Sequence, residues 1–192
     1  MNIMNTNKGY GLASRLLHWV VGLMIIYQLS IGFWMVDLPN NLKGPVYSDH
    51  KMYGLIILAL VMVRICWRVV NVLPDLPNTP IWQVVAARGL QRFFYLLMIL
   101  MPVTGWAMST AAGFLPVFPG LGKVAFPFVG NEQFCIIGHC FERSSMGSVS
   151  HELHHLIGFL FVGCLVIHTS IALWHAYLKD GIFSRILLDK TR

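Results

Sequence analysis

Residues 150–177 read SHELHHLIGFLFVGCLVIHTSIALWHAY and form one apolar segment with histidines inside it. The segment is longer than the roughly 20 residues that a helix needs to cross a bilayer. Histidines at membrane depth are costly and mark a cofactor, ion or proton site. His154 and His168 are fourteen positions apart, which puts them within about 40° of one helix face and about 21 Å apart along the axis. This spacing predicts two prosthetic groups stacked across the membrane.

The composition of the whole chain is that of a membrane protein. Of its 192 residues, 56% are hydrophobic and only 11% are charged, against about 25% charged in soluble domains. The first fifteen residues are polar and basic and show no signal-peptide pattern, so we expect the first apolar segment to be retained. We predict an all-α fold, an integral membrane four-helix bundle that occupies residues 1–192 as a single domain.

Four segments are predicted to span the membrane, approximately residues 16–35, 50–70, 89–110 and 150–177. A turn cluster at 37–41 ends the first span, and a short polar stretch precedes the second. The proline-containing linker 71–79 cannot continue a helix after the second. Residues 111–149 form a long connection on the opposite side from both termini.

The basic residues indicate the orientation of the bundle. Ten of the fourteen lie on the side that holds both termini and the linker between the second and third spans. The positive-inside rule therefore predicts that both termini are cytoplasmic and that 111–149 is a periplasmic loop. The net charge of +6 then reflects topology and contact with membrane lipid, and it requires no nucleic-acid partner.

Four histidines pair by depth in these spans. His18 and His168 lie toward the cytoplasmic side, and His50 and His154 lie at the outer edge. Facing helices that each supply an imidazole can hold a low-spin haem that transfers electrons and does not bind oxygen. We therefore expect these four histidines to be the axial ligands of two haem irons, in two sites about 20 Å apart.

The second span carries two further candidates for cofactor binding. Gly54 lies one turn below His50, where the lack of a side chain would let a flat macrocycle approach the backbone. Arg64 lies fourteen residues after His50, at the depth of the inner site, and its guanidinium would suit a haem propionate. The alternative for Arg64 is that it extends to the cytoplasmic interface.

The remaining histidines and cysteines admit simpler interpretations. His151 and His155 are rotated away from the His168 face, and His175 is closer to an interfacial position than to a ligand position. Cys135 and Cys140 could hold a metal together with His139, but an oxidising exterior favours a disulfide between them.

Several motifs together resemble the bacterial cytochrome b561 family. They are RLLHW at 15–19, HKMYG at 50–54, VRICWR at 63–68, PVTGW at 102–106, the His154 to His168 pair, and His175 followed by KDG at 179–181. The resemblance covers nearly the whole chain. It implies a four-helix bundle in the bacterial inner membrane with two haem b groups that exchange electrons with quinone, and it places the ligands on the same four histidines.

Two features depart from the family pattern. Gln91 stands, four residues before Tyr95, where the family often has a histidine, so the third span offers no ligand. The outer connection also carries an insertion-like segment at 130–148. That segment could cap the outer haem or meet a redox partner protein.

Three functions are compatible with these residues. The first is di-haem electron transfer from a periplasmic donor to membrane quinone. Superoxide is one donor within the family, which would make the chain a superoxide:quinone oxidoreductase. The outer side carries four basic and five acidic residues, so the charge there does not indicate steering of an anion.

The second possible function is a haem b membrane-anchor subunit that links a soluble dehydrogenase or hydrogenase to quinone. The third, a proton or metal transporter, is disfavoured because acidic residues are absent from all four span cores.

Overall fold

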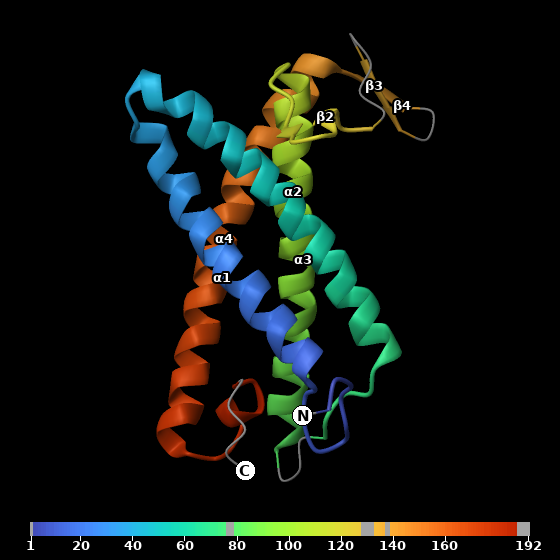
Figure 1. Cartoon of the computed structure of the whole chain (residues 1–192), viewed down its shortest axis with the longest axis vertical. Coiled ribbons are helices and arrows are strands. Elements are labelled where there is room, and N and C mark those ends of the chain that lie inside the picture. Colours follow the sequence, from blue (N-terminus) through green and yellow to red (C-terminus); the bar gives the residue numbers. More distant parts are fainter. Residues whose placement is uncertain (1, 76–78, 128–132, 137–138, 188–192) are drawn as a thin grey trace.

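The computed structural model describes residues 2–75, 79–127, 133–136 and 139–187. Its long helices are α1 (Leu12–Trp34), α2 (Asn40–Val70), α3 (Ile81–Ala111) and α4 (Arg143–Leu178), with short 3-10 helices η1 (Met35–Asp37) and η2 (Phe183–Arg185). All four long helices are apolar and long enough to cross a membrane. The predicted all-α, four-helix membrane fold is confirmed (Figure 1).

All four long helices begin earlier than the predicted spans, and α1 begins at Leu12, four residues before the predicted start at 16. α2 begins at Asn40, ten residues before the predicted start at 50, and includes Pro45 near its N-terminal end. α3 begins at Ile81 and α4 at Arg143, whereas their C-terminal ends lie within one residue of the prediction. Hydropathy marks only the apolar part of a helix, so polar turns that extend it beyond the hydrocarbon layer are missed. Pro45 is the sixth residue of α2 and lacks the N–H that would bond to the carbonyl of Asn41. Asn41 is exposed, so that carbonyl can be solvated instead.

α1 and α2 lean one way and α4 leans the other, and the N-terminal end of α1 and the C-terminal end of α4 lie at the same end of the bundle (Figure 1). That end is held together by hydrogen bonds between segments distant in sequence. Asn5 donates from its backbone N–H to Oδ1 of Asn71 and from its side-chain amide to the carbonyl of Val72. Arg15 donates to the carbonyl of Leu187 at 2.8 Å, and Trp19 donates to that of Ile186 at 2.9 Å.

Two small antiparallel hairpins lie at the opposite end, within the predicted loop 111–149 (Figure 1). β1 (Val117–Phe118) pairs with β2 (Gly122–Lys123), and β3 (Gln133–Ile136) pairs with β4 (His139–Glu142). The second register places Cys135 opposite Cys140, and Cys140 is disulfide-bonded. The sequence favours a disulfide over a metal site at Cys135 and Cys140, and the disulfide-bonded state of Cys140 agrees with that prediction.

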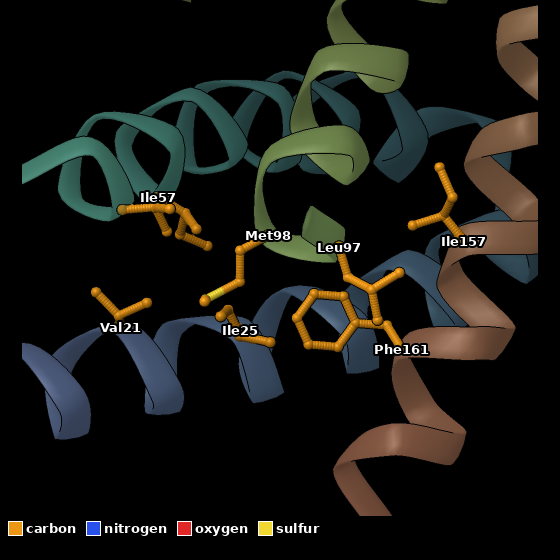
Figure 2. Packing of buried hydrophobic residues seen from close by; sticks show 8 residues of the cluster. Val21, Ile25, Ile57, Leu97, Met98, Ile157 and Phe161 are labelled. Atoms are coloured by element: carbon orange, nitrogen blue, oxygen red, sulfur yellow. The ribbon is translucent and has the colours of Figure 1, made fainter. Parts of the chain in front are cut away.

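The bundle core is a compact apolar layer that all four helices build (Figure 2). Its buried members are Val21, Ile25, Ile57, Val61, Leu97, Met98, Ile157 and Phe161. On α4 the core residues Ile157 and Phe161 fall between His154 and His168. Large apolar side chains such as Leu173 and Leu23, 66% and 60% exposed, cover the outside of the helices, as expected of a surface in contact with lipid.

Candidate cofactor site

The outer pair brings together α2 and α4. The ring centres of His50 and His154 are 6.4 Å apart, and their planes meet at 84°. His50 is the eleventh of the 31 residues of α2 and His154 the twelfth of the 36 residues of α4, so the pair lies in the half of the bundle toward the hairpins.

The inner pair brings together α1 and α4. The ring centres of His18 and His168 are 6.2 Å apart, and their planes meet at 63°. The edge of the Trp19 ring lies against His18, with ring centres 5.6 Å apart, and Phe94 on α3 lies against His168 at 5.4 Å. The structure thus brings the four predicted histidines together in the predicted combinations.

The separation of the rings can be compared with the separation that one bridging metal ion requires. A metal–imidazole bond is about 2 Å long, and a ring nitrogen lies about 1 Å from the ring centre given ordinary bond lengths. Two imidazoles that bind one ion from opposite sides therefore have centres about 6 Å apart. The observed 6.4 and 6.2 Å match this value. Both pairs fit a metal held between two facing rings.

His154 is oriented by contacts with α3. Its Nδ1 lies 3.0 Å from the carbonyl oxygen of Met101 and 3.3 Å from Oγ1 of Thr104. A carbonyl can only accept, so Nδ1 of His154 carries the proton and Nε2 is left with its lone pair. Ligating histidines commonly have this arrangement, in which the second nitrogen donates to a backbone carbonyl.

Gly105 on α3 is a residue that the sequence reasoning did not assign to the site. A Cβ atom built at this position would lie 2.9 Å from Cε1 of His154 and 3.2 Å from Nδ1. The lack of a side chain is therefore what lets the His154 ring lie against the α3 backbone. The signal was present in the sequence, because Gly105 belongs to the PVTGW motif at 102–106.

A cavity of about 80 Å³ adjoins the outer pair. Its lining is mostly apolar, and its few polar groups include His50, His154 and Gln28. Such a composition suits a largely hydrophobic cofactor fixed by a few polar contacts. Gly54 also lines this cavity. A Cβ there would lie 3.8 Å from Nε2 of Gln28, which is ordinary contact, so the protein around Gly54 leaves room for a side chain.

Gln28 is the other residue whose importance sequence reasoning missed. It is only 8% exposed in the middle of a membrane helix, and its Nε2 donates to the carbonyl oxygen of His50 at 2.7 Å. In the sequence, Gln28 could have been noticed as one of the few polar residues of the apolar span 16–35.

Arg64 lies beside the inner pair, at the depth that the sequence predicted. Its Nη2 donates to Nδ1 of His18 at 3.0 Å, and its guanidinium lies 5.8 Å from the centre of the Tyr95 ring. A guanidinium can only donate, so His18 carries its own proton on Nε2 in this arrangement. Binding a metal through Nε2 of His18 therefore requires Arg64 to move to another acceptor.

The other histidines that the structure describes lie away from these two pairs. His151 and His155 are exposed and stack on each other, with ring centres 4.6 Å apart. His175 donates to Asp180 just beyond α4, and this hydrogen bond lowers the pKa of the Asp180 carboxyl. Within the described ranges, no three His, Cys, Asp or Glu side chains gather as a metal site.

Comparison with known proteins gives matches over most of the chain. Residues 9–188 match the family described as prokaryotic cytochrome b561. Cytochrome b561 homolog 2 of Escherichia coli (strain K12) is 26% identical over 191 residues, which cover 97% of this chain and 95% of that protein. Cytochrome b562 of Cereibacter sphaeroides is 31% identical over 108 residues, which cover 53% of this chain and 67% of that protein.

Proposed function

This chain belongs to the prokaryotic cytochrome b561 family, and from this premise we propose that its two histidine pairs hold two haem b groups and pass electrons from a periplasmic donor to membrane quinone. Membership of this family shows that the chain is a multi-pass bacterial inner-membrane cytochrome that uses haem b in electron transfer. The number of haems, the ligands, the donor and the acceptor are the proposal.

The single observation that carries the proposal is the spacing of the two ring pairs, 6.4 Å outside and 6.2 Å inside. Haem iron with two imidazole ligands has no open coordination position and changes its charge by one electron. The residues of the chain supply the axial nitrogens and fix their direction. Because His154 donates its Nδ1–H to Met101, its Nε2 lone pair faces away from α3 and is available as the ligand.

Arg64 has a second role in this proposal. In the structure its guanidinium donates to His18, and a haem propionate is a better partner for it than a neutral imidazole, because a charge-assisted bidentate pair is stronger. We assign Arg64 to that carboxylate. The move would free Nδ1 of His18 and let its Nε2 act as a ligand.

The apolar layer between the pairs (Figure 2) has a role of its own. Val21 and Val61 have no exposed surface and Phe161 has 3%. Polar groups that could hold a chain of water are absent from this buried cluster. The layer therefore would let electrons cross the bundle while it blocks protons and ions.

The proposal places both termini in the cytoplasm and both hairpins in the periplasm. The support is the charge pattern, with ten of the fourteen basic residues on the side of the termini. The outer pair then faces the periplasmic donor, for which superoxide is the first candidate, and quinone is the acceptor.

The test uses purified protein in liposomes that contain ubiquinone, with superoxide generated outside and superoxide dismutase as the control. The proposal expects reduction of quinone that dismutase abolishes and that His154→Ala lowers at least tenfold. The superoxide assignment fails if the wild type reduces no quinone. Reduction that occurs only after a soluble dehydrogenase is added would favour the membrane-anchor function.

A further inference from the structure

Two buried polar atoms of the outer site have no hydrogen-bond partner. Among the described side chains these are Oε1 of Gln28 and Nδ1 of His50. Both residues line the same outer cavity. Buried polar groups are nearly always paired, and each exception requires an explanation.

The two unpaired atoms are chemically complementary. Oε1 of Gln28 can only accept a hydrogen bond, and Nδ1 of a neutral histidine donates one whenever Nε2 is used as a ligand. The residues are already in contact, because Nε2 of Gln28 donates to the carbonyl oxygen of His50 at 2.7 Å. The side-chain amide of Gln28 is therefore held against the turn of α2 that carries His50.

The opposite ligand of the same pair shows the arrangement that His50 lacks. His154 has its Nδ1 at 3.0 Å from the carbonyl oxygen of Met101, which fixes the tautomer. The described part of the chain offers Nδ1 of His50 no such backbone carbonyl. Gln28, which contacts the backbone of His50, carries a buried acceptor oxygen that has no partner among the described residues.

We propose that Gln28 is a positioning residue of the outer pair, whose amide oxygen accepts the Nδ1–H of His50 and directs Nε2 of His50 to the haem iron. This inference rests on the proposed function, in which His50 is an axial ligand. On α2 the side-chain amide of Gln28 lies against Gly54, where a Cβ would be 3.8 Å from Nε2, which is ordinary contact.

The proposal predicts a change in reduction potential that a merely structural residue would not cause. A hydrogen bond from Nδ1–H to an acceptor makes the ligand more basic, which stabilises ferric iron and lowers the potential. Gln28→Leu removes the acceptor and should raise the potential of one of two titration steps. Gln28→Glu strengthens the acceptor and should lower the same step.

The experiment is a spectroscopic redox titration of the purified holoprotein, with haem quantitation for every variant. His50→Ala identifies the outer step as the one that it abolishes. Ser30→Ala is the matched control, because it removes another polar group of α1, the hydroxyl bonded to the carbonyl of Ile26, and it should leave both steps unchanged. Loss of the outer haem in Gln28→Leu but not in Gln28→Glu would also support the role of the acceptor.

Three results would overturn the inference. They are unchanged potentials in a Gln28→Leu protein that holds both haems, a shift confined to the step that survives in His50→Ala, and loss of the outer haem in both Gln28 variants. Failure of the proposed function is distinct, since His50→Ala would then keep both haems.

Discussion

His154 is the residue whose surroundings most clearly prepare it to bind a metal. Its Nδ1 donates to Met101, and its ring lies against the backbone of Gly105, where a Cβ would be 2.9 Å away. The contact with Met101 keeps the proton on Nδ1. The contact with Gly105 lets the ring lie against the backbone of α3. Both contacts come from α3, which contributes no histidine of its own to the two pairs.

Gly105→Ala should therefore disturb the outer site without changing a ligand. The new methyl group displaces the His154 ring because a Cβ contact of 2.9 Å is shorter than real structures allow. We expect most of the outer haem to be lost, so that the pyridine haemochrome assay falls from about two haems per chain to about one.

The control for Gly105→Ala is Gly22→Ala on α1, where a Cβ would meet nothing within 4 Å. Gly22→Ala should retain the full haem content. A Gly105→Ala protein with wild-type haem content and an unchanged spectrum would show that the close approach does not position His154.

At the level of elements, hydropathy predicts the number of helices and the C-terminal ends of α2, α3 and α4, because these ends fall where the apolar run stops. It does not predict the first ten residues of α2, 40–49, which are helical but lie outside the apolar run. It also misses the hairpins of the outer connection, because pairing of short strands depends on contacts that composition does not reveal.

The C-terminal end of α4 provides a prediction about stability. Lys179 ends the helix in the left-handed conformation, with φ 51°. That conformation costs a residue with a Cβ about 1 kcal/mol and glycine much less. Lys179→Gly should raise the free energy of unfolding by roughly 1 kcal/mol, measured by thermal or denaturant unfolding in detergent.

The comparison for this change is Lys8→Gly, since Lys8 has no positive φ. It should give no gain in stability. The interpretation of the α4 terminus is wrong if Lys179→Gly is no more stable than the wild type.

At the scale of the whole molecule, the pairing of histidines by depth could be predicted because helical spacing and alternating direction of the spans fix it. The ring contacts could not, since Gln28 and Gly105 act through distances between helices that a single sequence does not contain. The position of Arg64 could be predicted only in part. Its depth follows from its offset from His50, whereas its hydrogen bond to His18 depends on how α1 and α2 cross.

The two sites also differ in electrostatics across the molecule. Arg64 lies beside the inner pair. At the haem propionate to which we assign it, its positive charge would still favour the reduced state of the inner haem, which carries one positive charge less. In the outer pair, His154 donates to the carbonyl of Met101, and the neighbouring Lys51 donates a hydrogen bond to the carbonyl of Phe114. We expect the inner haem to have the higher reduction potential, so that electrons move inward spontaneously.

Arg64→Met tests this expectation in a redox titration, because removal of the cation should lower the potential of the inner step only. The step is assigned as the one that remains in His154→Ala. A shift of the outer step, or an inner potential below the outer one in the wild type, would contradict the predicted direction of electron flow.

The central claim, that the two histidine pairs hold two haems, is tested most directly by the dithionite-reduced spectrum and haem content of the wild type beside His154→Ala. The account predicts a b-type spectrum with about two haems per chain, about one in His154→Ala, and about two in His151→Ala, a change to an exposed histidine of the same helix. A wild type that holds fewer than two haems, or a His154→Ala protein that keeps both, would contradict it.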